Sequence, residues 1–385
     1  MHNICYYITG HGLGHLTRSL EIINYILCSN SNHKLHIVSA IDQSILINSL
    51  SNNYNISKDQ LETSIMFYKR VLDSGAIQSD ALNVSRLDTL NTYYNNIYQN
   101  RQTLIDFEIQ FLQDSNIDIV LVDATPIAVR AAAATKCKVF ILSNFSWDYI
   151  YSELLKDLDI DDNHKEEYAK MIEQVSSDYS CCNLYIQYPG ICPVASCIES
   201  SKIVEGPLIS RRPMKSKIQM RKEYNIVNKK VLLLGFGGHK FDFSILKGSL
   251  PDDEWVCFVL GSAAEEMPSP NFIAVSFDCY VPDLLVLADC CLGKIGYGFV
   301  SECLSANCPL IYISRKNWAE EAHLIKLLCT TYSAGLEMPY EDFISGNWSS
   351  YLLKASSCKW ELQEYHNAKH APQIVFNIIE SYSSK

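Results

Sequence analysis

The chain has 385 residues, of which 48% are hydrophobic and 19% are charged. This composition excludes an intrinsically disordered protein, and the length exceeds one ordinary core, so we expect two domains of about 150–200 residues each. The net charge of −11 argues against a general nucleic-acid or anionic-membrane partner.

The cysteines number fifteen, several of them lie in apolar runs, and no secretory signal precedes them. We therefore expect reduced thiols in a cytoplasmic protein rather than a set of disulfides. No cysteine pair with histidine partners suggests a zinc site, and no apolar window of about twenty residues could cross a membrane. The sequence thus predicts neither a metal site nor a transmembrane segment.

The first predicted strand, residues 3–9, runs into Gly10-His11-Gly12-Leu13-Gly14-His15, and a helical pattern over 16–29 follows. Glycine lets the backbone approach a bound group, and the N–H groups of a helix start favour negative charge. The spacing is not that of the dinucleotide fingerprint, because His15 stands where a third glycine would be needed. A histidine here indicates chemistry as well as binding; the alternative is a tight turn with a solvent-facing imidazole.

The first half alternates strands and helices. We expect strands at 34–39, 117–122 and 139–142, helices at 43–50, 86–113 and from 125, and a polar loop at 71–80. This alternation predicts a parallel sheet covered by helices on both faces, in which ligands bind at the carboxyl ends of the strands. His15, Asp123 and Asn144 each follow a strand end, so one crevice could contain all three.

The second half repeats the pattern after a predicted linker at 206–222, which is rich in proline, serine and basic residues. We expect strands at 230–234, 255–260, 289–292 and 309–313, with helices at 282–288 and 372–384. The predicted fold class is α/β, with two Rossmann-like, doubly wound domains that face each other across a cleft. The expected domains are 1–205 and 206–365, and a helix within 366–385 is expected to pack back on the first.

Four segments resemble the N-terminal, glycosyltransferase-like domain of plant L-arabinokinase: 6–18, 72–82, 144–151 and 292–298. The resemblance covers nearly the whole chain. More distantly, the pattern is similar to GT-B glycosyltransferases of the MurG and plant UDP-glycosyltransferase type. The GHMP kinase half of arabinokinase has no counterpart here, so we do not expect arabinose phosphorylation.

The resemblance implies an inverting, metal-independent glycosyltransferase that uses a nucleotide-diphosphate sugar, UDP-linked, and an acceptor that the sequence does not identify. It implies that His15 is the base and that Asp123 orients it. Histidine titrates near neutrality, and a paired carboxylate stabilises the imidazolium that forms. The alternatives are a histidine bonded to loop backbone and, for Asp123, a helix N-cap.

The resemblance also implies that the second domain holds the donor, with backbone N–H groups against the diphosphate. Glu302 would bind the ribose, unless it is only an exposed helical residue, and Glu320 and Glu321 would contact the sugar, although the plant Asp/Glu-Gln pattern is absent. The predicted donor side is Gly237, Gly238, Lys294, Gly296, Tyr297, Gly298, Ser301, Glu302, Glu320 and Glu321. The predicted acceptor side is Gly10, His11, Gly12, Gly14, Asp73, Gln78, Asp80, Asn144 and Trp147, where Trp147 either stacks on a sugar or only packs.

Two other functions fit the same pattern. One is a non-catalytic nucleotide-sugar sensor or regulatory module, and the other is a GT-B-type nucleotide-sugar epimerase. The presence of both His15 and Asp123 favours the transferase, because a sensor needs only the donor half.

Overall fold

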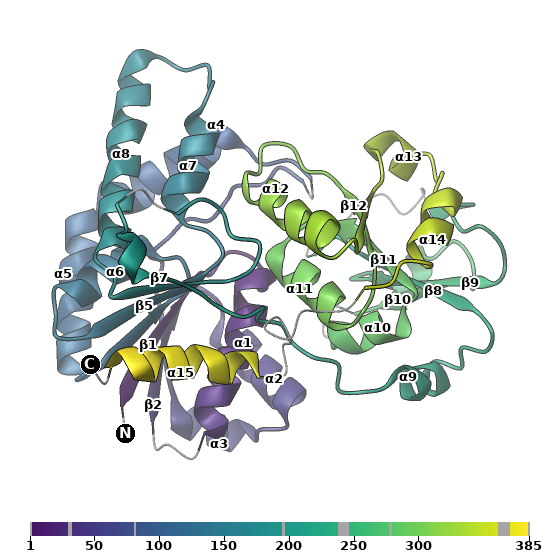
Figure 1. Cartoon of the computed structure of the whole chain (residues 1–385), viewed down its shortest axis with the longest axis horizontal. Coiled ribbons are helices and arrows are strands. Elements are labelled where there is room, and N and C mark those ends of the chain that lie inside the picture. The colour runs from purple at the N-terminus through teal and green to yellow at the C-terminus, as the bar shows by residue number, and fades with distance from the viewer. Residues whose placement is uncertain are drawn as a thin grey trace.

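Two parallel sheets form the scaffold of the protein. The computed structural model describes residues 2–29, 33–80, 82–194, 197–237, 246–276, 279–360 and 370–383. The first sheet has seven strands in the order β3-β2-β1-β4-β5-β6-β7, and the second has six in the order β10-β9-β8-β11-β12-β13. Figure 1 shows the sheets side by side, each with helices around it. The predicted class, two doubly wound α/β units, is confirmed.

We call the part around the first sheet, residues 2–205, the first lobe. Its strands are β1 Asn3–Ile8, β2 Lys34–Ser39, β3 Ile65–Lys69, β4 Ile119–Val122, β5 Lys138–Ser143, β6 Leu184–Gln187 and β7 Ile203–Glu205. Its α-helices are α1 Leu13–Cys28, α2 Gln43–Tyr54, α3 Lys58–Ser64, α4 Arg86–Tyr93, α5 Arg101–Asp114, α6 Pro126–Ala133, α7 Trp147–Leu155 and α8 Asp162–Ser180.

We call the part around the second sheet, residues 206–360, the second lobe. Its strands are β8 Lys230–Gly235, β9 Trp255–Leu260, β10 Phe272–Val275, β11 Cys290–Lys294, β12 Leu310–Ile313 and β13 Gly335–Glu337. Its α-helices are α9 Lys217–Glu223, α10 Val281–Leu287, α11 Tyr297–Ser305, α12 Glu320–Ile325, α13 Tyr340–Ile344 and α14 Ser349–Ala355. A last helix, α15 Ala371–Ser383, follows.

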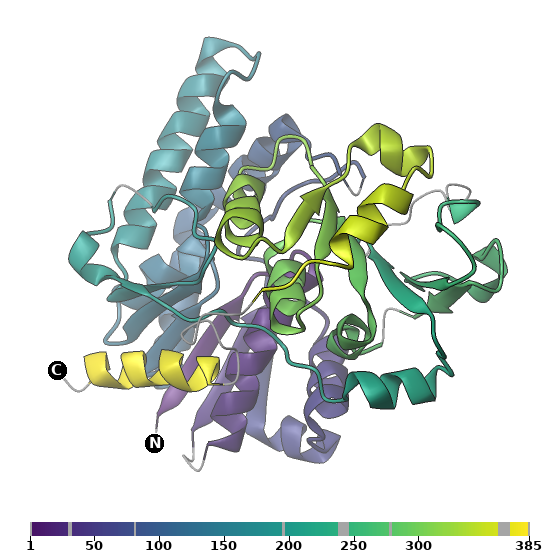
Figure 2. The same cartoon turned by 45° about the vertical axis from the view of Figure 1, so that its right-hand side comes forward.

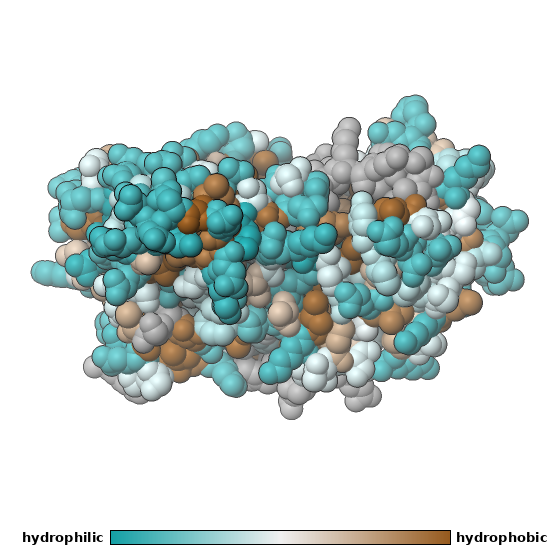
Figure 3. Space-filling view, turned by 90° about the horizontal axis from the view of Figure 1, so that it is seen from above, coloured by the Kyte–Doolittle hydropathy of each residue, from teal (hydrophilic) through white to brown (hydrophobic). Residues whose placement is uncertain are grey.

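The central strands are continuous apolar runs because helices cover both of their faces. β1, β4 and β5 are buried along almost their whole length. The face seen from above is largely polar, with hydrophobic residues in small groups (Figure 3). Within the described residues, no helix is both long and apolar enough to cross a bilayer.

Two expectations about the elements were wrong. The single helix expected over 86–113 is divided into α4 and α5 by a π-helical turn, Tyr94–Tyr98. The expected linker contains α9, which begins with a capping box formed by Ser216 and Gln219. The hairpin of α7 and α8, which projects from the first lobe in Figure 1, was not predicted.

The lobes touch where the start of α1 meets α11. A Cβ atom added to Gly298 would lie 3.0 Å from Thr17 Oγ1 and 3.3 Å from Gly14 Cα, so glycine lets the two helices approach. The chain returns to the first lobe in α15, as Figure 2 shows. There Phe376 contacts Tyr25 with ring centroids 5.1 Å apart, and Tyr382 contacts Phe140 at 5.8 Å.

Candidate active site

His15 and Asp123 form a hydrogen-bonded pair at the carboxyl edge of the first sheet. β1 and β4 are neighbours, so the segments that follow them lie side by side. His15 is in the first turn of α1, and its Nδ1 lies 2.8 Å from Asp123 Oδ2. Because an ionised carboxylate only accepts hydrogen bonds, we assign the proton to Nδ1. The other ring nitrogen, Nε2, then carries the lone pair that a general base needs.

The structure does not fit the alternatives, which were a solvent-facing or backbone-bonded His15 and a helix N-cap role for Asp123. Thr125, not Asp123, is the N-cap of α6. Asp123 is fully buried, and its carboxylate bonds to His15 and Arg18. The His15 side chain is 17% exposed and is neither in a solvent-facing turn nor paired with backbone through Nδ1. Its role as the base stays a prediction, but it has the geometry that the role requires.

Arg18 is the residue of this site that the sequence analysis missed. It lies one turn after His15 on α1 and is buried. Its Nε donates to Asp123 Oδ1 at 2.8 Å, Nη2 also bonds to that oxygen, and Nη2 lies 3.1 Å from His15 Nδ1. Burial disfavours the charged guanidinium, but the Asp123 carboxylate outweighs burial and raises the pKa of Arg18.

Asn144 connects this cluster to the second lobe. It follows β5, and its Oδ1 accepts a 2.6 Å hydrogen bond from Arg18 Nη1. Its Nδ2 donates to Glu320 Oε1 at 2.7 Å, and Trp318 Nε1 donates to the other oxygen of Glu320 at 2.9 Å. A chain of buried polar contacts therefore runs from the His15–Asp123 pair into the predicted donor side.

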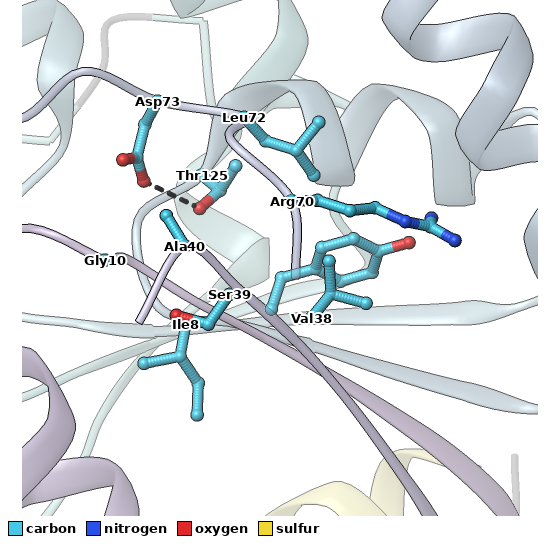
Figure 4. Close-up of a pocket in the computed structure, with 10 residues that line it drawn as sticks. Ile8, Gly10, Val38, Ser39, Ala40, Arg70, Leu72, Asp73 and Thr125 are labelled. Atoms are coloured by element: carbon cyan, nitrogen blue, oxygen red, sulfur yellow. Dashed lines mark hydrogen bonds between the residues drawn. The ribbon is translucent and has the colours of Figure 1, made fainter. Parts of the chain in front are cut away.

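A second histidine–carboxylate pair lies on the predicted acceptor side. His11 Nε2 is 3.1 Å from Asp73 Oδ1, and Asp73 Oδ2 accepts hydrogen bonds from Thr9 Oγ1 at 2.8 Å and Thr125 Oγ1 at 3.2 Å. Figure 4 shows Asp73 and Thr125 at a small recess that Gly10 also lines. Partial burial opposes a proton on His11, but Asp73 outweighs burial and raises the pKa of His11.

Two glycines around this pair are required by the backbone. Gly12 precedes α1 with φ +82°, a conformation that residues with a side chain rarely adopt. Gly75 has φ +58°, and a Cβ there would lie 2.3 Å from His11 Cβ. Around Gly14, by contrast, an added Cβ would meet no atom within 4 Å other than its chain neighbours and its own helix backbone. The first two glycines shape the loop, and the third leaves space beside His15.

Of Gln78 and Asp80, both on the predicted acceptor side, Asp80 is bonded through its side chain, whereas Gln78 is held through its backbone and its Oε1 is buried with no hydrogen-bond partner among the described residues. Gln78 pairs with Val84 in an isolated antiparallel bridge. Asp80 Oδ1 accepts hydrogen bonds from the backbone N–H groups of Leu82 and Asn83 at 2.8 and 3.0 Å, so the side chain stabilises the turn that contains it. The backbone N–H of Lys316 in the second lobe donates to Leu82 O at 3.1 Å. The loop that contains Gln78 and Asp80 belongs to the first lobe and also bonds to the second.

Trp147 is buried at the contact between the lobes. Its ring stacks on Tyr151 with centroids 5.1 Å apart and meets the edges of Phe145 at 5.3 Å and Trp318 at 6.4 Å. Phe145 in turn meets the His15 ring at 5.7 Å. Trp147 Nε1 is buried and has no hydrogen-bond partner within the part of the chain that the structure describes. Packing is thus the role that the contacts show, and stacking on a sugar stays a prediction.

The predicted phosphate-binding elements meet at the carboxyl edge of the second sheet. Gly237 follows β8, and a Cβ there would lie 3.5 Å from Lys294 Cε and 3.8 Å from Nζ. Burial and the neighbouring Arg315 lower the pKa of Lys294 to about 8. Gly296 is the N-cap of α11, so the first N–H groups of that helix are near the same strand end. Gly238 lies outside the described residues.

The side chains of Tyr297 and Ser301 bond within the protein. The Tyr297 hydroxyl accepts from the backbone of Ile209 at 3.1 Å, and Ser301 Oγ donates to Gly298 O at 2.9 Å. Both side chains are buried, and both hydroxyls bond to groups within the second lobe.

The three predicted donor-side carboxylates are all buried and paired. Glu302 is 4% exposed, which excludes the exposed helical alternative, and it accepts a 2.6 Å hydrogen bond from Arg211 Nε. Glu321 accepts from Arg315 Nε and from the Arg315 backbone, both at 2.7 Å. Burial is the main cause of the raised pKa of Glu321. Donor contacts by these residues stay predictions, and each carboxylate would have to share or exchange its present partner.

None of the fifteen cysteines forms a disulfide bond. Among the described residues, no group of three or more histidine, cysteine or acidic side chains is arranged to hold a metal ion.

The comparisons with known proteins agree with this architecture. No protein-family model matches the chain. Over 355 residues it is 34% identical to L-arabinokinase of Arabidopsis thaliana, a match that covers 92% of this chain and 32% of that protein. The chain therefore spans about a third of the length of this curated relative. The resemblance to plant L-arabinokinase is confirmed.

Solved structures match over the whole chain. The calicheamicin glycosyltransferase CalG4 has a TM-score of 0.62 and 13% identity, covering 100% of this chain and 99% of that one. UGT89C1 of Arabidopsis thaliana, complexed with UDP-L-rhamnose, has a TM-score of 0.62 and 12% identity, covering 100% and 98%. The fold is GT-B. At these identities the likeness establishes the GT-B fold alone.

Proposed function

We propose that the protein is a glycosyltransferase that moves a sugar from a nucleotide-diphosphate sugar, UDP-linked, to an acceptor hydroxyl. The observation that carries this proposal is the His15–Asp123 pair beside the contact with the second lobe. Solved structures of the same fold hold UDP-2-fluoro-glucose in UGT2 of Phytolacca americana and UDP-L-rhamnose in UGT89C1. The free thiols support a reducing, cytoplasmic site of action.

In the proposed reaction, His15 Nε2 takes the proton of the acceptor hydroxyl while its oxygen attacks the anomeric carbon. The bond from that carbon to the diphosphate oxygen breaks, and the nucleoside diphosphate leaves with the electron pair. Attack from the face opposite the leaving group inverts the configuration. Asp123 holds the ring and stabilises the imidazolium.

The leaving diphosphate would be stabilised by the second lobe. α11 begins just after β11, which pairs with the β8 strand that precedes Gly237, and the end of the Lys294 side chain lies beside Gly237. The N–H groups at the start of α11 and the Lys294 ammonium can offset the developing charge, so we propose that the reaction needs no metal ion. Glu302 would hold the ribose hydroxyls if its carboxylate also accepts them beside Arg211.

A screen of UDP-sugars tests this proposal. The purified protein is incubated with each donor, and free UDP, donor isomers and donor binding are measured. We expect UDP release with at least one donor. Isomerised donor without UDP release would instead indicate an epimerase, and tight binding without turnover would indicate a sensor; either result overturns the proposal.

A further inference from the structure

We propose that Arg18 is a positioning residue: it fixes the Asp123 carboxylate against His15 and offsets the charge of that carboxylate. The proposal rests on the proposed function for its use in catalysis, but its electrostatic part concerns the free protein. Nothing in the order of residues marks Arg18 as part of the site, because a basic residue in a helix is ordinarily solvated.

The position of the guanidinium carries the argument. Asp123 Oδ2 takes the Nδ1 proton of His15, and the other oxygen, Oδ1, is held by Arg18 through Nε and Nη2. The same Nη2 lies 3.1 Å from His15 Nδ1. An imidazolium formed at His15 would therefore face one anion and one cation. A histidine paired with a carboxylate alone would bind a proton more readily and would less often be free to act as a base.

Arg18 cannot swing away from this place. It is 3% exposed, Nη1 donates to Asn144 Oδ1 at 2.6 Å, and Nη2 donates to Ser143 Oγ at 3.2 Å. The guanidinium carbon also lies 5.1 Å from the centre of the Tyr297 ring and 5.9 Å from that of Tyr188. A lysine could supply the charge but not this planar set of bonds.

Among the titratable groups that the structure describes, Arg18 and Asp123 are the charges in contact with His15. Burial raises the pKa of Tyr6, Tyr188 and Tyr297, so these hydroxyls are neutral. Glu320 lies beyond Asn144 and bonds to its amide. His11 precedes α1 and pairs with Asp73 of the loop after β3, and Asp73 bonds to Thr9 and Thr125 rather than to His15.

An NMR titration of the histidines tests the proposal without substrate. The ten histidines are labelled at ring carbon Cε1, and the His15 signal is identified by its loss in His15→Gln. In Arg18→Met we expect the midpoint of the His15 titration to rise by about 1–2 pH units, because the offsetting cation is gone. Arg101→Met is the matched control: Arg101 pairs with Asp178 in the same lobe and is 18% exposed. There the midpoint should not move.

An unchanged midpoint in a folded Arg18→Met protein would overturn the proposal. If that variant does not fold, Arg18→Lys decides. Lysine keeps the charge but cannot fix the carboxylate, so we expect the midpoint to stay within about 0.5 pH unit while the downfield proton signal of Nδ1–H is lost. Retention of that signal would contradict the positioning role. Failure to turn over any UDP-sugar would defeat the proposed function but leave this titration result standing.

Discussion

Asn144 in the first lobe donates its side-chain amide to Glu320 in the second lobe, with 2.7 Å between Nδ2 and Oε1. The same Asn144 accepts from Arg18, which holds Asp123. The groups predicted to act on the acceptor and the donor are therefore joined by direct hydrogen bonds when the lobes are in contact. The same side chains therefore join the two lobes and hold the carboxylate that bonds to His15.

Asn144→Asp should weaken lobe closure. It places a second carboxylate opposite Glu320, and two buried anions without a proton between them cost several kcal/mol, of which we expect about 2–4 here. Small-angle scattering should show a larger radius of gyration, and UDP release should fall at least tenfold. Asn52→Asp, at an exposed position of α2, is the matched control.

The double variant Asn144→Asp with Glu320→Gln should restore closure. A glutamine amide at 320 can donate to the new carboxylate, which reverses the direction of the hydrogen bond. If the double variant scatters like Asn144→Asp alone, the contact between these two residues does not hold the lobes together.

UDP affinity should fall as the pH rises through about 8. Lys294 has a pKa lowered to about 8, so its ammonium is present below this pH and is lost above it. A bound diphosphate favours the charged form, so binding near pH 8 should take up a fraction of a proton. Calorimetry in two buffers of different ionisation enthalpy measures this uptake. Lys294→Gln should bind UDP about tenfold more weakly and show no uptake.

Glu302→Ala and Arg211→Met should separate the two roles of the buried Glu302–Arg211 pair. Both variants leave one buried charge without its partner, so each should lower the free energy of unfolding by about 3–5 kcal/mol. Only Glu302→Ala removes the acceptor for the ribose hydroxyls, and it should weaken UDP binding by a further 1–3 kcal/mol, on the order of one or two hydrogen bonds. Equal UDP affinities in the two variants would show that Glu302 has a structural role alone.

Asp123→Asn should lower the rate of donor turnover much more than it disturbs the fold. The asparagine no longer neutralises Arg18 and can favour the wrong tautomer of His15, so we expect donor turnover to fall on the order of 10³-fold. Thermal unfolding and UDP binding serve as controls for the fold. Turnover within a few-fold of the unaltered protein would remove Asp123 from the mechanism.

Much of the scaffold could be predicted, because strands of a buried parallel sheet are continuous runs of apolar residues. Strand-end positions placed His15, Asp123 and Asn144 at one edge, where the structure has them. Arg18 lies three positions after His15 and so on the same face of α1, but this spacing alone does not mark it as a residue of the site. Nothing in the local sequence indicates that this face is buried against two strand ends.

Contacts between the lobes could not be read from the sequence. Asn144 and Glu320 are separated by 176 positions, and their pairing depends on how the two sheets are placed, which local patterns do not encode. Within the second lobe, Glu302 pairs with Arg211 across 91 positions, which is also beyond the reach of local patterns. The break between α4 and α5 also lacks a signal, because the π-turn Tyr94–Tyr98 contains neither glycine nor proline.

General-base catalysis by His15 is tested by the rate of UDP release by His15→Gln at saturating donor, with UDP affinity measured on the same sample. We expect the rate to fall at least on the order of 10²-fold with UDP affinity unchanged, because general-base catalysis is removed while the second lobe is intact. A His15→Gln protein that releases UDP as fast as the unaltered protein would contradict it.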